Sequence, residues 1–390
     1  MVKPFQFARL PKIIFGNGRL AELPVIIKSY GGKIILVTGK SSFIESKKAS
    51  QLISEFKKNS IEYHLINVPG EPSPSMIDQA VSRFSNEDIK LVVGIGGGSV
   101  IDAGKALSAM IYKKESIMDF LEGIGSKEHP GTRLPFIAVP TTSGTGSEAT
   151  KNAVISQIGT DGFKRSLRND NLVPDIALVD PELTLNCPPD ITAASGMDCF
   201  TQLIEAYLSD KSNEYTDALA IEALKAVKAS LKRSYVNGED IEARTGMSFA
   251  ALTSGICLAN AGLGIVHGFA SSLGGIYDIP HGVICGTLMA LSNEINVREL
   301  RKKSDNEAAL NKYTLMGKLF IDEKGEKENY YIDAFIQYLH ELANDLHLTD
   351  FKKYGLNEKN VELICKRTEN KNNPVKLALE DLMEILTRLL

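Results

Sequence analysis

The first half of the chain alternates short apolar runs with longer segments in which apolar residues recur every three or four positions. Residues 33–38 form an apolar run rich in β-branched residues, which predicts a strand buried in a parallel sheet. Further strands are predicted over residues 63–68, 91–93 and 135–139. The periodic segments predict helices over residues 45–58, 75–84 and 99–111. Helices of this length between strands indicate right-handed βαβ crossovers and a mostly parallel, Rossmann-like sheet.

The pattern changes near Pro188 and Pro189. Beyond them strand signals nearly vanish, and long segments rich in Ala and Leu predict helices over residues 217–230, 244–259, 331–346 and 377–389. The charged stretch 322–329 is interpreted as a solvated loop. We therefore expect an α/β domain over residues 1–188 and an all-helical domain over residues 189–390.

Composition excludes several classes of partner. The 390 residues are 43% apolar and 24% charged, and the formal net charge is −4, which favours neither nucleic acid nor an anionic membrane. No apolar run approaches the roughly 20 residues of a membrane span, and the start lacks the apolar core of a signal peptide. We therefore expect a cytoplasmic protein.

The five cysteines are odd in number and widely spaced, without a C-x-x-C pair. This argues against a disulfide framework and against a cysteine zinc site. Cys199 and Cys285 fall beside the candidate site described below, and we interpret both as small buried packing residues.

A glycine-rich turn follows the third expected strand and opens a helix. It reads Gly94-Ile95-Gly96-Gly97-Gly98-Ser99. Glycines let a backbone approach a diphosphate, and the helix N-terminus favours its charge. Such a turn can also serve packing alone. This one lacks the third glycine of the usual fingerprint and does not follow the first strand.

A second polar loop follows the fourth expected strand, where residues 140–148 read Pro-Thr-Thr-Ser-Gly-Thr-Gly-Ser-Glu. Ligands of open α/β sheets bind at the carboxyl ends of strands, and this loop offers many donors there. The alternative is a Ser/Thr turn that caps a helix.

Candidate metal ligands lie in the second half. On a helix with apolar residues at 200, 203, 204 and 207, Asp198, Gln202 and Glu205 project from one side. Two of only six histidines follow, His267 and His281. A carboxylate with two imidazoles suits Fe(II) or Zn(II), and an open position would let the ion act as a Lewis acid. The alternative is that these three residues are unrelated.

The segments around these residues resemble the iron-containing (group III) alcohol dehydrogenases, which have a dehydroquinate synthase-like fold. In that family a Gly-x-Asp opens a helix, a His follows the Asp by four, and a His-Gly and a Pro-His-Gly come later. Asp198, His267 and His281 match three of the four ligand positions, and Gln202 stands at the fourth. Ser271 replaces a second His that often lies near the nicotinamide.

The resemblance extends to both loops and implies a nicotinamide cofactor. The family's Gly-Gly-Gly-Ser-x-x-Asp and Thr-Thr-x-Gly-Thr signatures imply cofactor contacts at Gly96, Gly97, Gly98, Ser99, Asp102, Thr141, Thr142 and Thr145. By the same resemblance, Asn152 and Lys164 fall on cofactor-contacting positions.

The residues at the end of the first expected strand indicate which cofactor is preferred, NAD or NADP. NAD-preferring enzymes usually place an acidic residue there to bind the ribose 2′-hydroxyl. Here Gly39 stands at that point, followed by Lys40 and Ser41, which could hold a 2′-phosphate. The sequence thus favours NADP(H) over NAD(H). Glu71, near the expected adenosine pocket, is predicted to face water.

The resemblance implies hydride transfer between the nicotinamide and a small alcohol or aldehyde in a cleft between the domains. Asp198, His267 and His281 would be the catalytic metal site, with Gln202 as a weaker fourth ligand. Two alternatives stay open: a metal-free reductase resembling maleylacetate reductases, and a dinucleotide-binding protein without catalysis. Family analogy suggests a homodimer.

Overall fold

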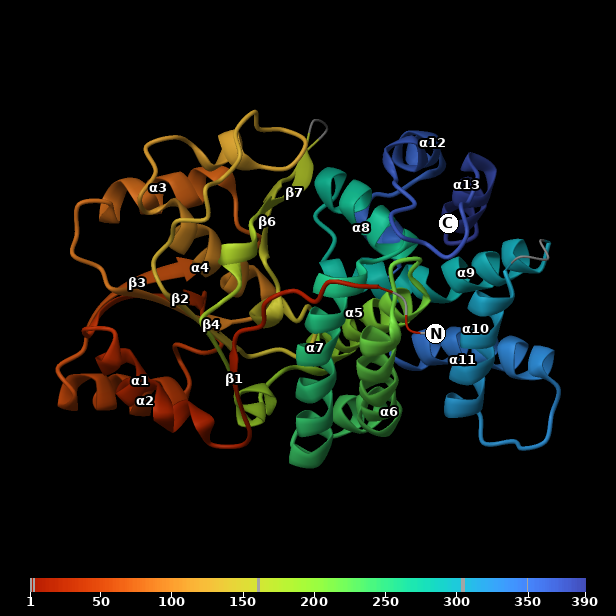
Figure 1. Cartoon of the computed structure of the whole chain (residues 1–390), viewed down its shortest axis with the longest axis horizontal. Coiled ribbons are helices and arrows are strands. Elements are labelled where there is room, and N and C mark those ends of the chain that lie inside the picture. The colour runs from red at the N-terminus through yellow and green to blue at the C-terminus, as the bar shows by residue number, and fades with distance from the viewer. Residues whose placement is uncertain (1, 3, 160–161, 303–305, 349) are drawn as a thin grey trace.

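The computed structural model describes residues 2, 4–159, 162–302, 306–348 and 350–390. An α/β part comes first along the chain, and an all-helical part follows (Figure 1). In the view of Figure 1 they lie side by side, with α5 and α7 of the helical part nearest the sheet.

The α/β part is built on a six-stranded parallel sheet with strand order β1-β8-β5-β4-β2-β3. Neighbouring residues such as Ile34 and Ile35 point to opposite faces, and both are fully buried. This burial on two faces explains the uninterrupted apolar runs. The strands are β1 (Lys12–Phe15), β2 (Lys33–Gly39), β3 (Glu62–Val68), β4 (Leu91–Gly96), β5 (Phe136–Pro140) and β8 (Ile176–Val179).

Helices cover both faces of the sheet. One face packs against α1 (Leu23–Ser29) and α2 (Lys47–Lys58), and the other against α3 (Pro74–Phe84) and α4 (Gly98–Met110). The helices that follow β2 and β4 thus lie on opposite faces, although these two strands are neighbours. A crevice opens at the carboxyl ends of such a strand pair, which is where doubly wound sheets bind ligands.

An antiparallel hairpin, β6 (Asn152–Gln157) and β7 (Phe163–Arg168), extends from the α/β part toward α8 (Figure 1). Short 3-10 helices connect the main elements of the chain: η1 (Arg19–Glu22), η2 (Ile117–Phe120), η3 (Ser147–Ala149), η4 (Asp170–Leu172), η5 (Pro181–Thr184) and η6 (Phe351–Tyr354).

The helical part contains the largest apolar core of the molecule, to which residues from Ala193 to Leu386 contribute. No strand follows β8 in the ranges that the structure describes. The helices are α5 (Pro189–Leu208), α6 (Glu214–Val236), α7 (Ile241–Ala261), α8 (Ile265–Ile276), α9 (His281–Arg301), α10 (Glu307–Phe320), α11 (Glu328–Asp345), α12 (Glu358–Arg367) and α13 (Leu379–Thr387).

The two parts meet where the polar loop after β5 packs on α7. Gly146 has φ of 61°, and a Cβ atom there would lie 2.5 Å from the carbonyl oxygen of Ala251. Only glycine fits this approach. An apolar cluster adds to the contact, with Ala177 and Val179 of β8 against Leu252 and Ile256 of α7.

The expected fold is confirmed: a parallel α/β part precedes a helical part. The strands expected at 33–38, 63–68, 91–93 and 135–139 are β2 to β5, and the expected helices are α2, α3, α4, α6, α7, α11 and α13. Strands β1 and β8 and the β6–β7 hairpin were not predicted from the sequence. The domain boundary at residues 188 and 189 stays a prediction.

Among the described residues, no single helix is long and apolar enough to cross a membrane. Helices α7 and α8 together have the length and apolar composition of a membrane span, but the pair is bent by 98°.

Candidate metal centre and cofactor cleft

A cleft of about 530 Å³ lies between the carboxyl edge of the sheet and helices α5, α8 and α9. Most of the residues singled out from the sequence line it: Gly39, Lys40, Gly97, Gly98, Ser99, Asp102, Thr142, Thr145, Asn152, Lys164, Asp198, Gln202, His267 and His281. Ser41, Gly96 and Thr141 were also expected to contact the cofactor but are not among the lining residues.

The glycine-rich turn brings three chain segments close together. A Cβ atom on Gly96 would lie 2.6 Å from the Val100 side chain, so this glycine serves the packing of β4 on α4. A Cβ atom on Gly98 would lie 2.7 Å from Cγ2 of Thr145, so this glycine lets the second polar loop approach. The backbone N–H groups that open α4 therefore face the cleft beside Thr142 and Thr145.

Asp102 is held by the protein itself, although it lines the cleft. Its carboxylate accepts hydrogen bonds from the Ser147 hydroxyl and, at 3.1 Å, from the Val154 backbone N–H. The Lys105 ammonium lies 3.9 Å away and donates to the carbonyl oxygens of Ser147 and Asn152 at 2.8 and 2.7 Å. Asp102 thus fastens α4 to η3 and β6 behind the glycine-rich turn.

Lys164 and Glu71 form an ion pair at the rim of the cleft. The Lys164 Nζ atom lies 3.1 Å from Glu71 Oε2, and the Ser156 hydroxyl donates to the same oxygen at 3.4 Å. The prediction that Glu71 faces water is therefore wrong. Burial raises the pKa of this carboxyl, but the charge of Lys164 outweighs it and leaves the pKa below its ordinary value.

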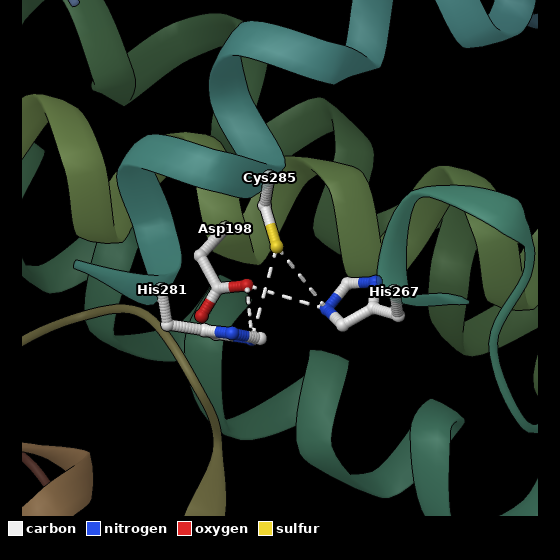
Figure 2. Close-up of side chains that lie close together, drawn as sticks. All are labelled: Asp198, His267, His281 and Cys285. Carbon is white, nitrogen blue, oxygen red and sulfur yellow. Dashed lines mark hydrogen bonds and ion pairs between the residues drawn. The ribbon is translucent and has the colours of Figure 1, made fainter. Parts of the chain in front are cut away.

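Asp198, His267 and His281 come together from three helices (Figure 2). Oδ1 of Asp198 on α5 lies 3.4 Å from His267 Nε2 on α8 and 3.5 Å from His281 Nε2 at the start of α9. Gly282 allows this arrangement, because a Cβ atom there would lie 2.2 Å from the Ala194 carbonyl oxygen on α5. His267 and His281 follow Asp198 by 69 and 83 positions in the sequence, yet all three side chains converge on one point.

Glu205 fixes the orientation of His267. Its Oε2 atom lies 2.6 Å from His267 Nδ1, and its Oε1 atom accepts from the Val266 backbone N–H at 2.6 Å. A carboxylate beside Nδ1 places the hydrogen on that nitrogen and directs Nε2 toward Asp198. Glu205 was predicted to lie on the same helix face as Asp198, but its role could not be predicted from the sequence.

The electrostatics favour a charged carboxylate at the centre. Burial raises the pKa of Asp198, but the His281 and His267 imidazoles outweigh it and bring the pKa to about 2. Burial lowers the pKa of His281 to about 4, so this imidazole is neutral. Burial also opposes the charged form of His267, yet Cys285 and Glu205 raise its pKa well above 6.5. A bound ion must therefore displace a proton from His267.

Cys285 is a fourth member of the cluster. Its Sγ atom lies 3.6 Å from His267 Nε2 and 3.7 Å from His281 Nε2, and the donor atoms of all four residues lie within 4.8 Å of one another (Figure 2). Burial raises the pKa of this thiol to about 12. Cys285 was predicted to be a packing residue, although its spacing of four from His281 indicates a second donor on the same helix face.

Gln202 and Ser271 stand at the two positions where the resemblance noted above implies histidine. The Gln202 Oε1 atom accepts from the Ser254 hydroxyl at 3.1 Å. The Ser271 hydroxyl donates to the His267 carbonyl oxygen at 3.0 Å, and Lys371 Nζ donates to the same oxygen at 2.9 Å. A segment near residue 371 thus reaches into the site and anchors α8.

The donor set fits a divalent ion. Oδ1 of Asp198, which is 1% exposed, finds no hydrogen-bond partner among the described residues. An unpartnered buried carboxylate oxygen costs free energy unless a cation satisfies it. A carboxylate, two imidazoles and a thiol facing one point form a donor set typical of Zn(II) or Fe(II).

Two family profiles cover most of the chain. The one described as iron-containing alcohol dehydrogenase matches residues 11–181, and the one described as the C-terminal part of the Fe-containing alcohol dehydrogenase family matches residues 192–390. The chain belongs to the iron-containing alcohol dehydrogenase family. The resemblance noted from its motifs is confirmed, and the chain is an enzyme of the oxidoreductase class.

Relatives in this family match nearly end to end. The NADPH-dependent butanol dehydrogenase of Clostridium saccharobutylicum is 31% identical and covers 96% of each chain. The NAD-dependent methanol dehydrogenase of Bacillus methanolicus is 26% identical and covers 96% of this chain and 97% of its own. The crystal structure of an archaeal halo-thermophilic alcohol dehydrogenase from a Red Sea brine pool matches with a TM-score of 0.90 at 26% identity. The match covers 100% of this chain and 99% of that chain.

Proposed function

We propose that this enzyme transfers a hydride between a nicotinamide dinucleotide and a small alcohol or aldehyde, with the substrate oxygen facing a divalent metal centre. The observation that carries the proposal is the convergence of Asp198, His267 and His281 on one point in a cleft that the glycine-rich turn also lines. Oxidation of the alcohol moves a hydride to C4 of the nicotinamide and releases a proton.

The metal site would be held by Asp198, His267 and His281, with Gln202 nearby on α5 as the fourth position that the family pattern implies. An ion bound there supplies Lewis-acid chemistry that polarises a carbonyl or an alcohol oxygen. Glu205 holds His267 in the tautomer that ligation needs.

The cofactor would lie along the carboxyl edge of the sheet. The N-terminus of α4, at Gly97, Gly98 and Ser99, would receive the diphosphate, and Thr142 and Thr145 would flank it. Asn152 and Lys164 line the same cleft, and they would contact the nicotinamide half of the cofactor. Asp102, Gly96, Ser41 and Thr141 would support these contacts from behind.

We further propose that NADP(H) is preferred over NAD(H). Gly39 ends β2 where an acidic residue would select NAD, and the exposed Lys40 follows it at the rim of the cleft. A 2′-phosphate there would gain a charge-assisted contact. The ratio of kcat/KM for NADPH to that for NADH tests this proposal, and a clear preference for NADH would refute it.

A metal-dependence experiment tests the main proposal. The purified protein is analysed for metals, stripped with a strong chelator, and titrated with Fe(II) or Zn(II) while NADPH and NADH oxidation is followed with a panel of small aldehydes. We expect activity to fall on stripping and to return with the ion. Asp198→Asn should lose both the ion and the activity while folding normally. Full activity of the stripped protein would contradict the metal role and favour a metal-free reductase, with His267 or His281 as the general acid.

Two proposals concern the setting of the enzyme. By analogy with the family we propose a homodimer, which sedimentation or light scattering would test. We also propose a cytoplasmic location, on the grounds of ordinary composition and five cysteines without a paired spacing. Fractionation of the source cells would test the second proposal.

A further inference from the structure

The metal centre contains a sulfur donor that the family pattern does not lead one to expect. We infer that the thiolate of Cys285, and not the amide of Gln202, is the fourth protein ligand of the ion. This inference rests on the proposed metal function, because it concerns the same centre. It keeps the number of protein ligands at four, changes which helix supplies the last one, and leaves the Lewis-acid role to a fifth coordination position.

The position of Cys285 on α9 makes it a partner of His281. The two residues are four apart, so they lie one above the other on the same helix face. The thiol is fully buried, and it points toward Asp198 and His267 together with the imidazole of His281 (Figure 2). The first turns of α9 therefore present two donors to one point.

Four of the six distances between the donor atoms match those between ligands that share a tetrahedral ion. With Zn–S of about 2.3 Å and Zn–N or Zn–O of about 2.0–2.1 Å, tetrahedral angles place sulfur roughly 3.5–3.6 Å from nitrogen and oxygen roughly 3.3–3.4 Å from nitrogen. The Cys285 sulfur lies 3.6 and 3.7 Å from the two imidazole nitrogens. The Asp198 oxygen lies 3.4 and 3.5 Å from the same nitrogens.

A simple hydrogen bond from the thiol does not account for the whole cluster. One S–H hydrogen can serve only one of the two imidazoles, and Asp198 Oδ1, although it lies 3.4 and 3.5 Å from the imidazole nitrogens, still forms no hydrogen bond. A divalent cation satisfies all four donor atoms at once. The ligands carry two negative charges, from Asp198 and from the ionised Cys285, so the divalent ion and its four ligands are neutral together.

Gln202 is a weaker candidate on both chemical and structural grounds. Its amide oxygen already accepts from Ser254, whose hydroxyl also lies within hydrogen-bond distance of the Ala251 carbonyl oxygen at 2.8 Å. A neutral amide donates less charge to a borderline ion than a thiolate does. The sulfur ligand thus compensates for the imidazole that is absent at residue 202, and it favours Zn(II) over Fe(II).

The test uses Co(II) as a spectroscopic substitute for the ion in the full-length protein. A thiolate bound to Co(II) gives a charge-transfer band in the near ultraviolet, whereas oxygen and nitrogen ligands give none. We expect this band in the wild-type protein with one equivalent of Co(II), and we expect it to persist in Gln202→Ala. In Cys285→Ser the band should vanish, and competition with a chelator should show an affinity at least about tenfold lower.

Cys199→Ser is the matched control. Cys199 is equally buried and adjoins Asp198 on α5, but its thiol is not part of the four-donor cluster. This variant should keep both the band and the affinity. Thermal unfolding of each variant checks the fold, and X-ray absorption of the wild-type zinc protein provides a measurement without any substitution. We expect one Zn–S distance of about 2.3 Å.

The outcomes separate this inference from the proposed function. If wild-type protein binds Co(II) without the band, or if the band survives in Cys285→Ser, Cys285 is not a ligand, although the metal-dependent function stands when activity follows the ion. If the protein binds neither Co(II) nor Zn(II) and chelated protein is fully active, both the metal function and the ligand assignment are refuted.

Discussion

Replacing Glu205 by glutamine tests how the metal centre is oriented. The carboxylate accepts two hydrogen bonds at once, from the Val266 backbone N–H and from His267 Nδ1–H, each at 2.6 Å. An amide has one acceptor oxygen. If that oxygen serves Val266, the amide N–H groups face Nδ1, and the hydrogen of the neutral imidazole moves to Nε2. That nitrogen then has no lone pair for an ion.

The size of the effect follows from the position of Glu205 behind a ligand. Loss of a carboxylate that orients a ligating imidazole typically lowers metal affinity by about 10–100-fold, or about 1.4–2.7 kcal/mol. Glu205 is 6% exposed and His267 is 4% exposed, so water cannot replace the lost contact. We therefore expect Glu205→Gln to fall in the upper half of that range.

The assay is competition for Zn(II) with a chelator of known affinity, together with metal analysis after gel filtration. Glu294→Gln is the matched control, because Glu294 also contacts a histidine, at 2.8 Å from His340 Nε2, but outside the cluster. The control should leave zinc affinity unchanged within about twofold. Urea unfolding of both variants checks that neither loses the fold.

Unchanged zinc affinity in folded Glu205→Gln would refute the reasoning, because it would mean that the tautomer of His267 does not govern ligation. Equal losses in Glu205→Gln and Glu294→Gln would also refute it, since the effect would then follow from the lost charge and not from the position.

Three further substitutions test the cleft and the α/β part. Gly39→Asp should shift the ratio of kcat/KM toward NADH by at least about tenfold, because a carboxylate repels a 2′-phosphate and binds a ribose hydroxyl. An unchanged ratio would mean that the adenosine end of the cofactor binds elsewhere. Gly98→Ala should raise KM for the dinucleotide at least about tenfold, because the new methyl group would lie 2.7 Å from Thr145. In the control Gly70→Ala the methyl group meets nothing within 4 Å. Equal KM values in the two variants would contradict the prediction. Burial raises the pKa of Glu148 from 4.5 to about 7, so the folded state binds more protons than the unfolded state between these values. The free energy of unfolding should therefore include a term that falls as pH rises through this window, by at most about 1.4 kcal/mol per pH unit. Urea titrations at several pH values should show that the free energy of unfolding depends less on pH in Glu148→Gln than in the wild type. Identical pH profiles for the two proteins would contradict the prediction.

The fold could be predicted where burial leaves a simple pattern. Strands β2, β4 and β5 are apolar and buried along most of their length, so each appears as an apolar run between helical periods. Strand β1 has only four residues, two of them exposed, and β7 carries three basic residues. Neither contains enough buried apolar positions to distinguish it from a loop, which explains why both were missed.

The site could be predicted only in part. Asp198, His267 and His281 stand in short motifs with rare residue types, and the structure brings their side chains together. Glu205 contacts His267 because α5 packs against α8, and Lys371 contacts it because a distant segment packs against α8. Such contacts between elements leave no periodic pattern in the sequence. Cys285 did leave a signal, its spacing from His281, but this signal was read as burial alone.

The anchoring of α8 by a much later segment has a consequence for synthesis. The Lys371 ammonium donates to the His267 carbonyl oxygen 104 residues earlier, and the Asn373 amide oxygen accepts from the Ile265 backbone N–H. At about 5–20 residues per second, the ribosome needs about 5–20 s to make the intervening chain. For the last 86 residues of that stretch, from Cys285 to Lys371, the nascent chain carries all four cluster residues but lacks the clamp on α8. Chaperones and metal ions therefore meet an unfinished centre first.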